Sequence, residues 1–62
     1  MPFTNGDKRA AAEREAKQRV WVYPRLVANG RMKKATAERE IALMEEIAAD
    51  YAKLEQATER LI

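Results

Sequence analysis

The sequence predicts an all-α fold: an antiparallel helical hairpin with a proline-kinked first helix, two copies of which form a four-helix bundle. The chain has 62 residues with only two glycines and two prolines, so little interrupts a helix. Strong helix formers (Ala, Glu, Arg, Lys) are abundant on both sides of Asn29-Gly30. Beyond this pair, large apolar residues recur at spacings of three and four, which is typical of helices. At this length we expect one domain, residues 1–62, since ordinary domains have about 100–200 residues.

The first predicted helix covers residues 7–28 and follows a start, residues 1–6, that we expect to be disordered. Thr4 and Asp7 have the spacing of a capping box, with Asp in place of the usual Glu or Gln. At about 100° per residue, a narrow stripe of this helix would face its partner. The stripe consists of Ala16, Val20, Tyr23 and Val27.

Pro24 disturbs this helix. It has no N–H to donate, and its ring opposes the carbonyl of Val20. Tyr23, the residue before it, is pushed toward extended conformations. Either the helix kinks here, or it ends and a short helix begins with Pro24 in its first position. We favour a kinked or broken continuation to Ala28.

Residues 29–33 form the predicted turn. Asn-Gly between strands would indicate a type I′ hairpin, but helical sequence flanks this pair. Gly30 therefore fits the left-handed position just after a helix. Met32, two residues later, is expected to pack back on Leu26 or Val27.

The second predicted helix covers residues 34–61 and begins between Lys33 and Ala37, with Thr36 as a candidate N-cap. Its apolar arc spans about 160°, against about 100° for a helix with one partner. Ile41 and Leu43 contribute to this width. The heptad a and d positions are Met44, Ile47, Tyr51, Leu54, Thr58 and Leu61.

A single hairpin cannot cover all of this apolar surface. Three large residues of the first helix also fall outside its stripe, and contiguous exposed apolar patches usually mark interfaces. We therefore expect a two-fold homodimer, the commonest symmetric assembly. The predicted self-association interface consists of Trp21, Val22, Leu26, Met44, Ile47, Tyr51, Leu54 and Leu61.

The charges are distributed unevenly. Residues 1–40 carry ten basic and five acidic residues, whereas residues 41–62 carry two basic and five acidic ones. Such asymmetry indicates either a polyanion-binding half or two segments that pair with each other. The candidate polyanion-binding residues are Arg14, Lys17, Arg25, Arg31, Lys33, Lys34 and Arg39.

Three of these cations flank Trp21 on one side of the first helix. Cations beside an aromatic ring could follow a phosphate backbone and stack a base. In the alternative interpretation, which we favour, Trp21 fills a dimer core and the cations pair across the hairpin. Their partners would be Glu45, Glu46 and Glu55.

Several functional classes are excluded or disfavoured. The chain has no His and no Cys, which rules out zinc sites built on them and Ser–His–Asp or Cys–His catalysis. The carboxylate pairs Glu38/Glu40 and Glu45/Glu46 point apart on a helix, so we expect a solvated face. We therefore expect no enzyme, no metal and no cofactor. No apolar run approaches the roughly 18 residues of a membrane helix, and no secretory signal is recognisable, so we expect a soluble cytoplasmic protein.

Two segments, residues 19–32 and 37–47, carry a pattern that is similar to small uncharacterised helical proteins of phage and prophage origin. In that family a VYP..V..G.M segment precedes an A..EI..ME.I helix. The matching residues are Val22, Tyr23, Pro24, Val27, Gly30, Met32, Ala37, Glu40, Ile41, Met44 and Ile47. The family often has Ser or Thr after its Met, where this chain has Lys33. The resemblance implies a compact helical unit from a mobile element and supplies no catalytic residues.

The sequence thus favours a non-enzymatic, self-associating interaction module that acts through protein partners. Two alternatives stay open: a nucleic-acid-binding accessory protein that uses the basic turn, and a phage inhibitor of a host protein.

Overall fold

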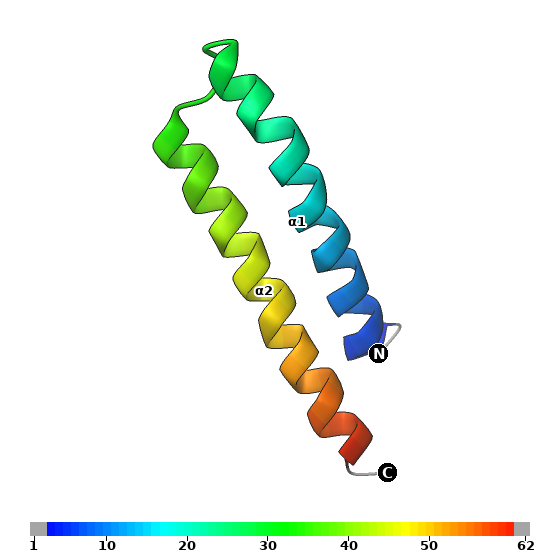
Figure 1. The fold of residues 1–62 in the computed structure, drawn as a ribbon. Coiled ribbons are helices and arrows are strands. Elements are labelled where there is room, and N and C mark those ends of the chain that lie inside the picture. The colour runs from blue at the N-terminus through cyan, green and yellow to red at the C-terminus, as the bar shows by residue number, and fades with distance from the viewer. Residues whose placement is uncertain (1–2, 61–62) are drawn as a thin grey trace.

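Two antiparallel α-helices joined by a short turn make up the fold (Figure 1). The structure is a computed structural model that describes residues 3–60, with side chains up to residue 57. Helix α1 spans Asn5–Ala28 and helix α2 spans Lys34–Arg60. The molecule is a rod of 49 × 18 × 16 Å. The prediction of an all-α helical hairpin is confirmed.

Helix α1 begins at Asn5, two residues before the predicted start, so the expectation of disorder is wrong for residues 3–6. The cause is the capping box. The hydroxyl of Thr4 accepts a hydrogen bond from the Asp7 N–H at 3.0 Å, and the Asp7 carboxylate accepts one from the Thr4 N–H at 3.2 Å. Two otherwise free backbone donors are satisfied at once, which fixes the first turn. Residues 1–2 of the expected disordered start lie outside the described residues.

Pro24 lies inside α1, which continues without a break to Ala28 (Figure 1). The alternative in which Pro24 ends the helix is therefore wrong. The missing N–H removes one backbone hydrogen bond, but the next turn closes normally. The N–H of Asn29 donates to the Arg25 carbonyl at 3.0 Å.

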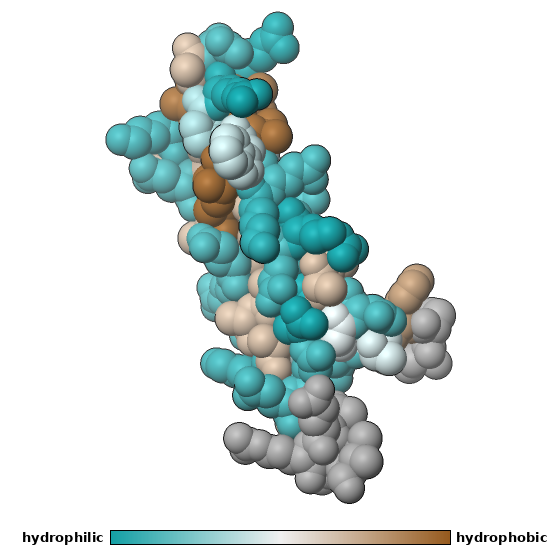
Figure 2. Space-filling model, turned by 45° about the vertical axis from the view of Figure 1, so that its right-hand side comes forward, coloured by the Kyte–Doolittle hydropathy of each residue, from teal (hydrophilic) through white to brown (hydrophobic). Residues whose placement is uncertain are grey.

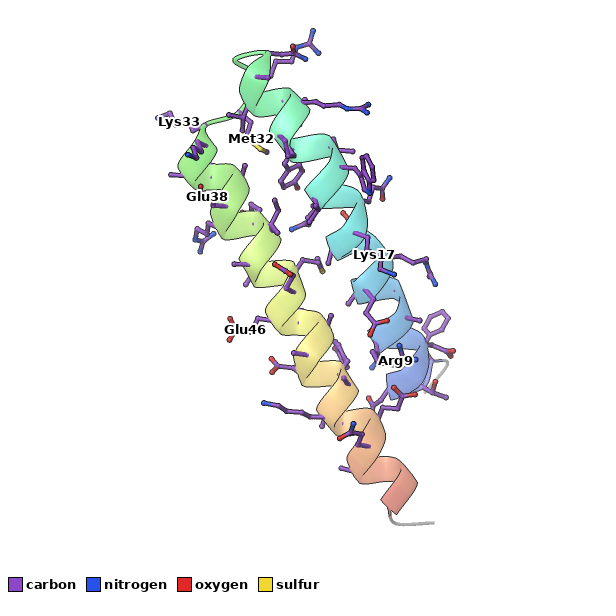
Figure 3. The ribbon with its side chains drawn as sticks, in the orientation of Figure 1. Arg9, Lys17, Met32, Lys33, Glu38 and Glu46 are labelled. Atoms are coloured by element: carbon purple, nitrogen blue, oxygen red, sulfur yellow. The ribbon has the colours of Figure 1, made fainter. Side chains whose placement is uncertain are left out.

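Gly30 ends α1 as predicted, with a left-handed φ of 71°. Its N–H donates to the Val27 carbonyl at 3.0 Å, and the Arg31 N–H donates to the Leu26 carbonyl at 2.9 Å. These two bonds form a Schellman motif, which satisfies the last carbonyls of the helix and turns the chain. Beyond it, the sulfur of Met32 lies between the two helices near the turn (Figure 3).

We expect the substitution Gly30→Ala to lower the free energy of unfolding by about 1 kcal/mol, because a left-handed backbone strains any residue with a Cβ. No atom lies within 4 Å of an added Cβ, so crowding contributes nothing. For a domain of this size the melting temperature should fall by about 4–8 °C. Gly30→Asn is the control and should fall less, because Asn tolerates this conformation. If Gly30→Ala melted with the wild type, the turn would have to adopt another conformation.

Helix α2 begins at Lys34, and the N–H of Ala37 donates to the carbonyl of Lys33 at 3.0 Å. Lys33 therefore occupies the position before the helix. Thr36 lies within the first turn, so its assignment as the N-cap is wrong. Leu61, the predicted last residue, lies outside the described part of the chain.

The seam between the helices is built from alanines. Among the described residues, the four buried side chains are Ala12, Ala16, Ala37 and Ala48. Small side chains at the contact let two helices approach closely. The large residues along this seam, Tyr23, Met44 and Tyr51, are half-buried, and no large described side chain is fully buried.

The observed seam is rotated by roughly 40–50°, about half a residue, from the predicted stripe, and it keeps the predicted Ala16 and Tyr23. On α1, Val20 is 50% exposed and Arg19 lies closer to α2, so the assignment of Val20 to the stripe is wrong. On α2, Ala37 and Ala48 take the seam, while Leu54 is largely exposed. The alanines determine how each helix is rotated about its axis, because the two helices pack together where their side chains are smallest.

Candidate interaction surfaces

One flank of α2 carries an exposed apolar stripe. Leu43, Ile47 and Leu54 are spaced by four and seven residues, which places them within about 40° of one another. Leu43 is 42% exposed, Leu54 is 49% exposed, and Ile47 is intermediate. They lie beside the alanine seam, so α1 leaves much of this stripe uncovered.

Apolar residues of α1 lie on the same flank of the hairpin, as a contact across the seam shows. The guanidinium of Arg19 donates to the carbonyl of Glu40 at 3.0 Å and lies 3.4 Å from its carboxylate. Arg19 lines a hollow together with Val22, and Glu40 precedes Ile47 by seven residues, hence on the same face. Val22 and Ile47 therefore border one continuous side of the hairpin.

We call this surface the apolar flank. It consists of Val22, Leu26, Leu43, Ile47 and Leu54. From Leu54 to the level of the turn it follows α2 for about 30 Å, at 1.5 Å per residue. It therefore extends over more than half of the 49 Å length of the molecule.

Four of the eight predicted interface residues lie on the apolar flank: Val22, Leu26, Ile47 and Leu54. Met44 and Tyr51 are half-buried beside the seam, where Tyr51 receives the ammonium of Lys8 at 5.6 Å from its ring centre. Leu61 lies outside the described residues. Leu43 was not included in the predicted interface, although its spacing to Ile47 and Leu54 could have identified it.

The opposite flank holds a shorter apolar groove at the turn end, with a volume of about 250 Å³. Its walls are Pro24, Val27, Lys34, Ala37, Glu38 and Ile41. Farther from the turn the surface is charged, since Arg9 pairs there with Glu13 at 2.9 Å. Figure 2 shows hydrophobic atoms gathered near the turn end and mostly hydrophilic ones along the middle of the visible face. This groove is therefore confined to one end of the hairpin.

Two arginines of α1 make the ion pairs that cross the seam. The Arg9 guanidinium donates hydrogen bonds to Glu55 and to Glu13, and these bonds, chiefly the one to Glu55, raise the pKa of the guanidinium. Arg19 pairs with Glu15 at 3.2 Å and with Glu40, and its guanidinium lies 5.7 Å from the ring centre of Tyr23. Neither of these ion pairs across the seam was predicted from the sequence, because the rotation of each helix about its axis decides which charged side chains meet.

The expected pairing between the predicted polyanion-binding cations and α2 carboxylates is wrong within the described residues. Glu55 pairs with Arg9 instead, and neither Glu45 nor Glu46 forms an ion pair with a described residue. Glu46 projects from α2 on the side away from α1 (Figure 3). Of the seven predicted cations, Arg39 alone has an ion pair in the part that the structure describes, with Glu40 at 3.5 Å.

The remaining six cations are all exposed and are distributed over α1, the turn and the start of α2. Lys17 and Arg25 lie four residues before and after Trp21, so all three share one side of the helix. Arg14 lies one further turn toward the N-terminus. Trp21 is 73% exposed and lies about 200° around the helix from the half-buried Tyr23, hence facing away from α2. Trp21 therefore lies apart from the apolar flank, although the predicted self-association interface includes it.

Arg31, Lys33 and Lys34 lie in the turn and at the start of α2, and all three are exposed. Lys33 points outward from the turn (Figure 3). We call the side of α1 that carries Arg14, Lys17, Trp21 and Arg25 the basic ridge.

Within the described residues, no group of three or more carboxylates converges in a way that could hold a metal ion. Neither α1 nor α2, as far as they are described, has a stretch apolar enough to cross a membrane. Comparison of the chain with protein-family models, with curated proteins and with solved structures finds no match.

Proposed function

We propose that this protein is a non-enzymatic interaction module that self-associates through its apolar flank into a homodimer with a four-helix core. The observation that carries the proposal is the composition of the seam. Its four buried side chains are all alanines, and no described large apolar side chain is fully buried. A lone domain of this size is marginal even with a normal core, and the chain has no cysteine for a disulfide.

The exposed area of the chain supports the same proposal. Its accessible surface is 5125 Å². A compact monomer of 7.1 kDa is expected to expose about 4,100 Å². A second hairpin packed on the apolar flank would remove much of this excess and would bury the leucine and isoleucine side chains that the alanine seam leaves outside.

A two-fold dimer suits the charges that border the apolar flank. In such a dimer each surface meets its own copy, so a cluster of like charges would face itself. Here Arg19 pairs with Glu15 and Glu40, and Glu40 also pairs with Arg39, so these four charges cancel within the chain. Asp50 is an exposed carboxylate between Ile47 and Leu54 on the flank itself. The flank therefore opposes its copy with apolar side chains, paired ions and one carboxylate.

The substitution Ile47→Glu tests this interface. A carboxylate placed at the centre of the apolar flank would be buried without a partner on dimerisation, which costs several kcal/mol. We expect the dissociation constant, measured by sedimentation equilibrium, to rise by about 100-fold or more. The melting temperature of the wild type, but not of the variant, should rise with protein concentration.

Ala49→Glu is the matched control, because Ala49 is exposed on the same helix but away from the apolar flank. It adds the same charge and should leave the dissociation constant nearly unchanged. Equal association of Ile47→Glu and the wild type would refute this interface, as would equal weakening by both variants.

A further inference from the structure

The basic ridge is a second surface that self-association does not explain. Residues 16–37 contain six cations and no acidic residue. On the ridge, Arg14, Lys17 and Arg25 surround the most exposed of the large apolar side chains, Trp21. We propose that the basic ridge binds single-stranded nucleic acid, with the cations on phosphates and one base stacked on the Trp21 ring.

The ridge cations are available for an external anion. Arg14, Lys17 and Arg25 form no ion pair with any described residue, whereas Arg9 and Arg19, on the seam, each pair with two carboxylates. Binding a phosphate at the ridge therefore breaks no internal pair among these residues. It releases counterions from the nucleic acid instead, which makes binding favourable at low salt.

The spacing along the ridge suits a strand that follows the helix. Lys17 and Arg25 lie one helical turn on either side of Trp21, and the ridge from Arg14 to Arg25 is about 17 Å long. Arg31 adds an exposed cation in the turn just beyond the end of α1. A strand laid along this line has cations on both sides of the base that meets the indole ring.

The exposed indole favours a single strand over a duplex. Every unpaired base offers a π-face, and stacking on an aromatic side chain stabilises single-strand complexes largely independently of sequence. In a duplex these faces are already stacked on neighbouring bases. A membrane surface fits less well, since helices that lie on membranes present a row of large apolar side chains. Here the neighbours of Trp21 on its side are Gln18, Pro24 and the cations, so no such row is present.

Self-association would leave the ridge accessible. Trp21 is one residue from Val22, so the two side chains diverge by about 100° around α1. A dimer closed by the apolar flank therefore carries two exposed ridges. Each proposal can be refuted without the other, because mass measurements test self-association through the flank and nucleic-acid titrations test binding at the ridge.

The test is a titration of the full chain with a labelled 12-nucleotide oligo(dT), followed by fluorescence anisotropy at low salt. Trp21 is the only tryptophan of the chain, so quenching of its fluorescence reports stacking directly. We expect saturable binding and quenching. The logarithm of the affinity should fall with the logarithm of salt by about 0.7 for each phosphate contacted. The variant Trp21→Ala should bind about 5- to 150-fold more weakly.

Matched variants separate stacking and charge from folding. Trp21→Phe keeps an aromatic face and should retain most of the affinity. Lys17→Glu should weaken binding at least severalfold, whereas Lys53→Glu, which reverses an exposed charge on α2, should have little effect. Circular dichroism checks that each variant is helical.

Four outcomes would overturn the proposal or its stacking contact. The first is an oligonucleotide that leaves Trp21 unquenched, and the second is Trp21→Ala binding as tightly as the wild type. The third is a response of Trp21 to anionic phospholipid vesicles but not to the oligonucleotide, which would make a membrane the partner. Equal affinity for a duplex of the same length would contradict the stacking step.

Discussion

Replacing Pro24 with alanine is expected to raise the free energy of unfolding by about 2 kcal/mol. Proline inside a helix costs about 3 kcal/mol, because it removes a backbone hydrogen bond and its ring crowds the preceding turn. Alanine would restore the N–H that donates to the Val20 carbonyl. The gain is reduced by up to about 1 kcal/mol, since proline also restricts the unfolded chain. Pro24 is exposed, so little packing is lost.

Urea denaturation at fixed protein concentration measures this change. Arg25→Ala is the control, because it introduces alanine at the next residue, also exposed and helical, without touching the proline. Its stability should stay close to that of the wild type. A Pro24→Ala protein no more stable than the wild type would show that the proline stabilises the turn end as much as it weakens the helix.

The substitution Ala48→Leu is expected to lower the free energy of unfolding by about 1–3 kcal/mol. Ala48 is buried in the seam, where its small side chain allows the close approach of the helices. A leucine there must move the backbones apart or adopt a strained rotamer. The neighbouring Ala49 is exposed, so Ala49→Leu is a matched control with the same added volume and little expected effect. The account of an alanine seam would be contradicted if the two variants were equally stable.

Local features of the fold could be predicted because they depend on neighbouring residues. The capping box needs only Thr4 and Asp7 at the correct spacing, and the end of α1 needs only a glycine that can adopt a positive φ. Both are present in the structure. The continuity of α1 through Pro24 is harder to predict, because a proline inside a helix is locally unfavourable.

The rotation of the helices about the seam could not be predicted in the same way. A hydrophobic stripe favours Val20 toward α2, yet Arg19 lies nearer to it. The long stem of arginine can lie along an apolar surface while its guanidinium reaches the rim, here at Glu40. Whether Val20 or Arg19 faces α2 depends on where the alanines of both helices meet. The apolar stripe of one helix does not show this.

The candidate surfaces were predictable in composition but not in arrangement. The cations around Trp21 share one helical face, which spacing alone indicates. Whether they pair with Glu45 and Glu46 depends on the direction in which α2 presents those carboxylates, and Glu46 points away from α1 (Figure 3). For the same reason Trp21 separates from Val22, although the two are adjacent in sequence.

The central claim is that a second copy of the chain supplies the apolar contacts that the alanine seam lacks. Light scattering coupled to gel filtration at micromolar concentration tests it most directly, because it measures mass independently of shape. The claim predicts twice the 7.1 kDa mass of the chain, and a mass of 7.1 kDa at that concentration would contradict it.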